Sequence, residues 1–160
     1  MYKEYGEGIK VFLSYSRKDA ALQDELAAHL TALKLRGVIQ DWTDAQVEAG
    51  TEWDKAIASY LDSADIILLL LSPDFLASEY SLDEAQRALK RNESGQARVI
   101  PVILRPVDFL ATPFAKLQFS PSDGKPITLW THRDEAFLSV ARDIRKAARE
   151  LLAQAATNDA

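Results

Sequence analysis

Short apolar runs alternate along the chain with segments in which apolar residues recur every three or four positions. The apolar runs predict five strands, which cover residues 9–15, 38–41, 65–72, 98–104 and 127–130. The periodic segments predict amphipathic helices over about residues 18–35, 53–64, 81–92 and 137–151. The run Ile66–Leu71 has no polar interruption, which is typical of a central strand that is buried on both faces.

Strands that alternate with helices predict one α/β domain with a five-stranded parallel sheet and helices on both faces. For a sheet of this size the expected strand order is the flavodoxin-like order 2-1-3-4-5. We expect the domain to cover residues 9–153, between an N-terminal tail, 1–8, and a frayed C-terminal tail, 154–160. Pro101 lacks an N–H and suggests local edge character or a bulge in the fourth strand.

The topology predicts where a site would form. In this strand order the switch point lies between strands one and three, at their carboxyl ends. Residues 14–17 leave the first strand there, and residues 72–74 leave the third. The next helix is expected to open at Ser81, with Glu84 in its first turn. Arg17 and Glu84 should therefore approach one crevice.

Composition narrows the class of protein. The chain has 160 residues, a net charge of -5 and no cysteine. The acidic balance argues against a general nucleic-acid binder, because there is no basic excess to release phosphate counterions. The lack of cysteine rules out disulfides and thiolate metal sites and fits a reducing compartment. The polar N-terminus is not typical of a signal peptide, and no apolar run is long enough to span a bilayer.

Several common sites are absent from the sequence. No Gly-x-Gly-x-x-Gly follows the first strand, and no P-loop lysine pattern occurs. Ser16, Arg17 and Ser72 occupy positions where a receiver domain would need acidic residues. The two histidines, His29 and His132, are too few and too far apart in sequence to suggest a metal site.

Four short motifs occur in an order that is similar to a known family. They are Val11–Arg17 (VFLSYSR), Asp41–Asp44 (DWTD) with Glu48–Gly50 (EAG), Leu71–Ser78 (LSPDFLAS), and Glu84. Together they resemble a TIR (Toll/interleukin-1 receptor) domain of the bacterial type, and the resemblance runs from about Ile9 to about Leu151. It implies the same five-stranded flavodoxin-like fold.

The resemblance also implies an activity. Many bacterial and plant members cleave NAD+ between ribose and nicotinamide, with a catalytic glutamate in a Trp-x-x-x-Glu pattern. Tyr80–Glu84 matches that pattern, with tyrosine where tryptophan is common. The implied function is an NAD+ hydrolase or cyclase that is activated by self-assembly, in prokaryotic immune (antiphage) or cell-death signalling. NAD+ would be the substrate, and no cofactor or metal is expected. The expected partners are other TIR domains, in homo-oligomers that can extend into filaments. Neither nucleic acid nor a membrane is expected as a partner, and the expected compartment is the cytoplasm.

The residues expected in the site follow from the pattern and the resemblance together. Glu84 is the expected catalytic residue. The expected substrate contacts are Tyr15, Ser16, Arg17, Trp42, Asp44, Ser72 and Tyr80. The loop Trp42–Thr51 corresponds to the family's BB loop, and its expected assembly residues are Asp41, Trp42, Asp44, Glu48 and Gly50.

One carboxylate is chemically sufficient for this reaction. Glycosidases usually need two, because one must protonate a poor leaving group. The nicotinamide of NAD+ is already a cation and leaves neutral, so a single carboxylate can stabilise the oxocarbenium-like ribose. Structural, non-catalytic interpretations of these residues remain open. Glu84 could form an exposed ion pair with Arg87, three residues later on the same helix. Ser72 could serve only to cap the end of a strand. The whole chain could be a non-catalytic TIR scaffold.

Overall fold

The centre of the sheet is β3 (Ile66–Leu71), whose six residues are all buried, as the sequence predicts. The computed structural model describes residues 8–42 and 52–158. In these residues β1 (Ile9–Ser14) and β4 (Arg98–Ile103) flank β3, and β2 (Ile39–Trp42) pairs with β1. All three pairings are parallel, and the order is β2-β1-β3-β4. The strand order predicted for the first four strands is therefore confirmed.

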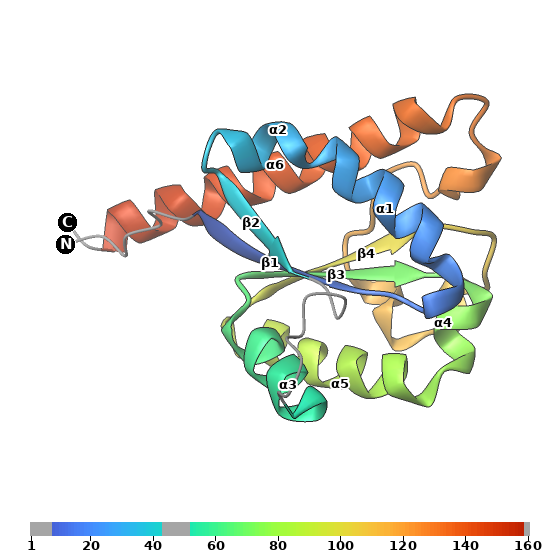
Figure 1. Ribbon diagram of the computed structural model, residues 1–160, viewed down its shortest axis with the longest axis horizontal. Coiled ribbons are helices and arrows are strands. Elements are labelled where there is room, and N and C mark those ends of the chain that lie inside the picture. Colours follow the sequence, from blue (N-terminus) through green and yellow to red (C-terminus); the bar gives the residue numbers. More distant parts are fainter. Residues whose placement is uncertain (1–7, 43–51, 159–160) are drawn as a thin grey trace.

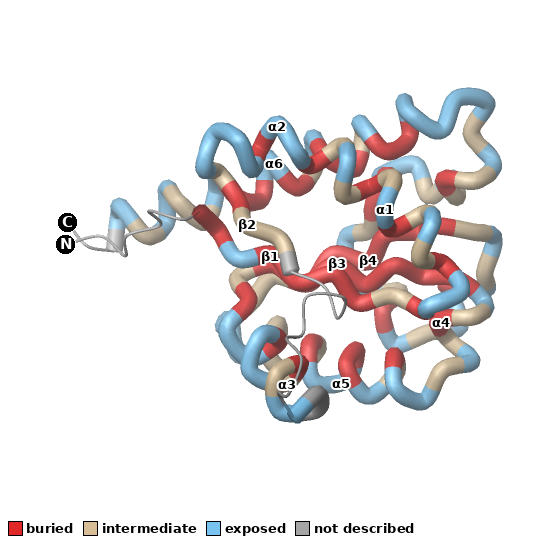
Figure 2. The backbone as a smooth tube through the Cα atoms, viewed as in Figure 1, coloured by how far each residue is buried: buried red, intermediate tan, exposed pale blue. Residues whose placement is uncertain are grey.

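Helices cover both faces of the sheet (Figure 1). One face carries α1 (Ala20–His29), α2 (Thr31–Leu35) and α6 (Arg133–Asn158). The other carries α3 (Trp53–Ser63), α4 (Pro73–Ala77) and α5 (Glu79–Glu93). Alternate residues of β1 point to the two sides, so that Val11 and Leu13 join one buried core and Phe12 joins the other. Figure 2 shows the buried backbone concentrated in the sheet between these helical layers.

The first predicted helix is divided into shorter elements. It begins with the 3-10 turn η1 (Arg17–Asp19), which Ser16 caps by accepting from the N–H of Lys18. At Leu30 the backbone N–H lies 3.1 Å from the carbonyls of both Leu26 and Ala27, and this tight turn separates α1 from α2. No helix in the described ranges is both long and apolar enough to cross a membrane.

The predicted fifth strand is wrong. Residues Ile127–Leu129 form a 3-10 turn, η5, and Ile127 is buried by packing rather than by strand pairing. The place beside β4 is taken by Ser120, which accepts from Ile103 and donates to Pro101 at 2.9 Å each. Pro101 has no N–H and its carbonyl faces this outer edge, so one donor of a ladder is missing there. The segment between β4 and Ser120 contains two further 3-10 turns, η3 (Phe109–Ala111) and η4 (Pro113–Lys116).

Two helix ends also differ from the prediction. α5 begins at Glu79, because the Ser78 hydroxyl caps it by accepting from Ser81 N–H at 3.2 Å. Glu84 is therefore in the second turn of α5 rather than the first. α6 continues to Asn158, through most of the segment that was expected to be a frayed tail.

Glycine at position 8 provides a test of how β1 begins. Gly8 has a φ of +91°, and a Cβ there would lie 2.8 Å from the backbone atoms Gly37 O and Ile39 N. Gly37 also has a positive φ, +70°, but nothing lies within 4 Å of a Cβ built there. We expect Gly8→Ala to lower the free energy of unfolding by roughly 3 kcal/mol and Gly37→Ala by roughly 1 kcal/mol. Urea denaturation of both variants measures the difference, and equal losses would contradict the packing described at Gly8.

Candidate active site

Glu84 and Ser14 meet at the carboxyl end of the sheet. Ser14 is the last residue of β1, and its hydroxyl donates to Glu84 Oε1 at 2.7 Å. Both residues are buried, and Glu84 is only 6% exposed. The sequence prediction that Glu84 approaches the end of the first strand agrees with this contact. A carboxylate is thus held inside the fold, at the edge where ligands bind in open α/β sheets.

The alternative that Glu84 forms an exposed ion pair with Arg87 is wrong. Arg87 binds Asp62 of α3, with its Nη2 3.2 Å from each carboxylate oxygen, so its partner is not Glu84. Glu84 lies on the inward face of α5, whose buried members are Ser81, Glu84, Ala85 and Ala88. A carboxylate at such a position is costly to bury unless it is hydrogen-bonded. Its retention there is therefore more typical of a site than of a solvated helix surface.

A second polar cluster joins the ends of β1, β3 and β4. The Ser72 hydroxyl donates to Asp19 and also accepts from the N–H of Phe75 at 3.0 Å, which caps α4. Arg105 Nη1 lies 3.1 Å from Asp19 Oδ1. The same guanidinium binds Asp74 Oδ2 through Nη1 at 2.7 Å and Nη2 at 2.8 Å. These contacts fix η1 and α4 against the end of β4.

Sequence reasoning missed Asp19 and Arg105 in this cluster. They are 86 positions apart, so no local spacing connects them. The available signals were that Arg105 follows the end of a buried strand and that Asp19 lies three residues after a capping serine. Neither signal identifies the partner. Only the folded sheet, which brings the strand ends to one edge, does so.

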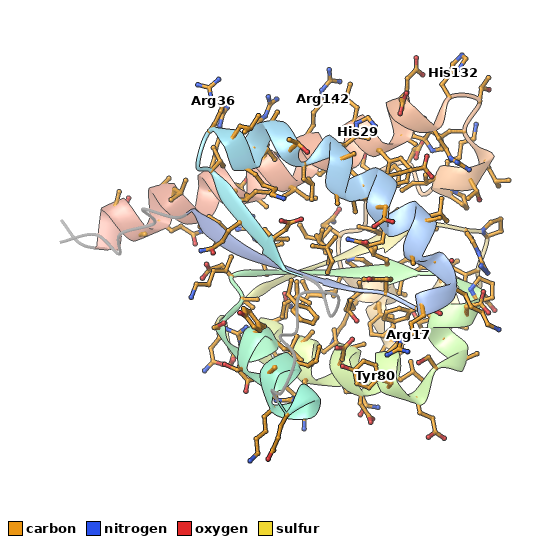
Figure 3. All side chains as sticks on the ribbon, in the orientation of Figure 1. Arg17, His29, Arg36, Tyr80, His132 and Arg142 are labelled. Atoms are coloured by element: carbon orange, nitrogen blue, oxygen red, sulfur yellow. The ribbon has the colours of Figure 1, made fainter. Side chains whose placement is uncertain are left out.

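The predicted substrate residues occupy different environments. Arg17 is exposed on η1 and makes no ion pair with any described residue, whereas Tyr80, one turn before Glu84 on α5, is 36% exposed. Figure 3 draws Arg17 and Tyr80 in the same part of the view. Ser16 is buried as the cap of η1, and both hydrogen-bonding functions of Ser72 are used within the fold. Tyr15 is partly buried and packs against the core on the α1 and α6 side.

The predicted assembly loop lies mostly outside the described residues. This applies to Asp44, Glu48 and Gly50, and to the side chain of Trp42. Asp41 is described, and it belongs to β2 rather than to a loop. Its carboxylate is largely buried and lies 3.0 Å from Lys34 Nζ of α2. Asp41 therefore stabilises the packing of α2 on the sheet edge.

No group of three or more candidate metal ligands (His, Cys, Asp or Glu) occurs within residues 8–42 and 52–158. The arrangement offers a buried, hydrogen-bonded carboxylate, a nearby serine and an exposed arginine on the adjoining turn. Such a set can stabilise a developing positive charge and bind an anionic group of the same ligand.

Comparisons with known proteins agree with this architecture. The sequence model of the family described as "TIR domain" matches residues 11–139. Uncharacterized protein y4lF of Sinorhizobium fredii (strain NBRC 101917 / NGR234) is 51% identical over 139 residues, which are 86% of this chain and 43% of that protein. The chain therefore spans less than half the length of that relative.

One solved structure shows the likeness of fold, and a second is reported beside it. The TIR domain of the Toll-related receptor TRR-2 from Hydra magnipapillata has a TM-score of 0.55 at 18% identity, covering 84% of this chain and 97% of that chain. The TIR domains in the structure of the activated Roq1 resistosome have a TM-score of 0.47 at 17% identity, covering 94% of this chain and 84% of that chain.

Proposed function

Because the chain belongs to the TIR domain family, which includes NAD+ hydrolases, we propose that it cleaves the nicotinamide–ribose bond of NAD+ with Glu84 as the catalytic carboxylate. The observation that carries the proposal is the position of Glu84, 6% exposed and hydrogen-bonded by Ser14 at the carboxyl edge of the sheet. An acid retained only for helix solubility would face solvent, as Asp83 does. The proposed setting is prokaryotic immune or cell-death signalling.

Glu84 acts by charge stabilisation. The bond between ribose C1′ and the nicotinamide nitrogen breaks, and its electron pair neutralises the ring cation. Positive charge develops on the ribose as nicotinamide leaves, and the ionised carboxylate stabilises it. Water, or a nucleophile within the remaining ADP-ribosyl group, then bonds to C1′, loses a proton to solvent, and gives the hydrolysed or the cyclic product. Because Glu84 lies inside the fold, its charge is less screened than it would be in water.

The neighbouring side chains bind the substrate and orient the Glu84 carboxylate. The Ser14 hydroxyl holds one carboxylate oxygen, which limits the rotamers of Glu84. Arg17 is available for a diphosphate oxygen, and the ring of Tyr80 is available for stacking. Ser72 acts indirectly, by holding Asp19 and the first turn of α4. Tyr15, which is partly buried directly after β1, is a second ring available for stacking on the substrate.

If self-assembly activates the protein, the rate of nicotinamide release should depend on protein concentration. If a second protomer completes the site through the loop that contains Asp44, nicotinamide release should rise more steeply than linearly with protein concentration. We expect Asp44→Arg to abolish this rise without unfolding the domain. Nicotinamide release across a dilution series, with light scattering on the same samples, measures both. Constant specific activity from a protein that stays monomeric would refute activation by assembly, and assembly without any nicotinamide release would favour the scaffold function.

A further inference from the structure

Two of the three residues of the 3-10 turn η1 are bound to the ends of neighbouring strands. Asp19 is buried, and each of its carboxylate oxygens has its own partner. Oδ2 accepts from the Ser72 hydroxyl, and Oδ1 lies 3.1 Å from Arg105 Nη1. Lys18 Nζ lies 3.6 Å from Asp74 Oδ1, at the start of α4. The turn that follows β1 is therefore held against the segments that follow β3 and β4.

Arg105 is central to these contacts, because its guanidinium binds both carboxylates. The group that contacts Asp19 also binds Asp74 Oδ2, through Nη1 at 2.7 Å and Nη2 at 2.8 Å. The backbone beside Arg105 is fixed to the sheet, since Leu104 N–H donates to the Leu71 carbonyl at 3.0 Å. A planar guanidinium holds carboxylates in a defined geometry, whereas an ammonium acts as a point charge. Arg105 thus fixes the distance between η1 and α4.

The turn η1 needs such contacts to keep its position. Its own hydrogen bonds join Ser16 to Lys18 N–H at 3.3 Å and to Asp19 N–H at 2.8 Å. These bonds close the turn on itself but do not join it to the other strand ends. Turns of this length have poor internal hydrogen-bond geometry, and a single turn is not stable alone in water. The direction in which η1 faces therefore depends on Ser72, Asp74 and Arg105.

The remaining residue of η1 is Arg17, which is exposed and makes no ion pair with residues 8–42 or 52–158. Figure 3 draws Arg17 and Tyr80 close together in its view of the site. Arg17 and Asp19 belong to the same short turn, so the contacts that fix Asp19 also fix the backbone from which Arg17 extends. A change at Arg105 should consequently be felt at Arg17.

We propose that Arg105 is a positioning residue for NAD+ binding, which holds η1 through Asp19 so that Arg17 is presented to the diphosphate of the substrate. This role rests on the proposed function, in which Arg17 binds a diphosphate oxygen. Arg105 itself does not contact the substrate, because both of its Nη atoms are bound to carboxylates of the protein. It acts from the end of β4, on the far side of the carboxylates that it binds.

The role of Arg105 is separate from the chemical step. Glu84 accepts from Ser14, and Ser14 is held in the sheet by its pairing with Leu69 of β3. That contact does not pass through η1 or Arg105. A diphosphate contact is remote from the bond that breaks, so it contributes equally to the binding of substrate and transition state. Arg105→Gln should therefore raise KM for NAD+ about tenfold and change kcat by less than about threefold.

The test measures NAD+ binding by isothermal titration calorimetry in the Glu84→Gln protein, in which the substrate is not consumed. Adding Arg105→Gln to this background should raise the dissociation constant about tenfold. Adding Arg17→Ala should raise it at least as much. In protein that already lacks Arg17, Arg105→Gln should change the dissociation constant by less than about twofold, because the residue through which Arg105 acts is gone. A merely structural role would cost the same with and without Arg17.

Two further variants control for folding and charge. Arg98→Gln removes the same charge at the other end of β4, where Arg98 pairs with Glu150, and it should leave NAD+ binding within about twofold. Asp74→Asn weakens the hold of Arg105 on α4 but leaves Asp19 paired, and it replaces Arg105→Gln if that variant does not fold. It should weaken binding by at least about threefold. Circular dichroism and light scattering on each sample establish equal folding and assembly.

The proposal is overturned if Glu84→Gln does not bind NAD+, or if the change at Arg105 (or at Asp74 in its place) leaves the dissociation constant unaltered. It is also overturned if the loss is the same with and without Arg17, or if Arg98→Gln loses binding equally. The expected binding results without nicotinamide release from the parent would refute NAD+ cleavage and still support the positioning role of Arg105.

Discussion

Replacing Glu84 with glutamine is expected to slow nicotinamide release by about a hundredfold or more. Glutamine keeps the size of the side chain and can still accept from the Ser14 hydroxyl, which lies 2.7 Å from Oε1 in the parent. It removes the negative charge that stabilises the ribose cation. The rate should therefore fall while the fold is retained. Nicotinamide release under substrate saturation, with circular dichroism of both proteins, measures the effect.

Asp83 is the matched control for this substitution. It precedes Glu84 on the same helix, carries the same charge, and is exposed rather than buried. Asp83→Asn should leave the rate per assembled protomer within about twofold of the parent, because an exposed charge is strongly screened by solvent. Equal rates for the parent and Glu84→Gln would show that Glu84 is not catalytic. Equal losses in both variants would point to a general effect of charge on α5.

The second large effect is expected on stability, at Arg105. Arg105→Gln should lower the free energy of unfolding by about 2–3 kcal/mol. The Asp19 side chain is only 1% exposed, and without Arg105 its carboxylate would keep Ser72 as a partner but lose its cation. The estimate lies below that for a fully buried pair, because the Arg105 side chain is 29% exposed. Chemical denaturation of the purified variant measures the loss.

Arg98 provides the comparison at the other end of β4. Its side chain is 30% exposed and also pairs with a carboxylate, but that partner, Glu150, is itself well exposed. Arg98→Gln should cost less than about 1 kcal/mol. Asp19→Asn in the Arg105→Gln background should recover part of the loss, since the amide carries no charge to bury. Similar losses at Arg98 and Arg105, or no recovery with Asp19→Asn, would contradict the role given to the buried cluster.

The sequence was sufficient to predict the core of the sheet. The uninterrupted run Ile66–Leu71 identified β3 as central, and helices between the strands predicted a parallel sheet, for which the flavodoxin-like order was the natural choice at this size. Placing Glu84 near the end of β1 followed from that topology alone. These features depend on hydrophobic periodicity and connection rules, both of which act over short stretches of chain.

Features that depend on tertiary contacts were not predictable in the same way. Ile127 lies in an apolar run like a strand, but its burial comes from packing, and Ser120 occupies the edge of β4 instead. The partnership of Asp19 with Arg105 exists only because two strand ends meet at one edge. The inward direction of Glu84 could not be predicted either, because sequence spacing alone allowed an exposed ion pair with Arg87.

We propose above all that this TIR domain cleaves NAD+ at the nicotinamide–ribose bond. Proton NMR of purified parent protein with NAD+ tests it most directly, since it follows free nicotinamide and the ribose C1′ proton in one sample. We expect nicotinamide to appear in step with the loss of NAD+ in the parent, and about a hundredfold more slowly in Glu84→Gln. Intact NAD+ in both samples, at concentrations where light scattering shows the parent to be assembled, would contradict it.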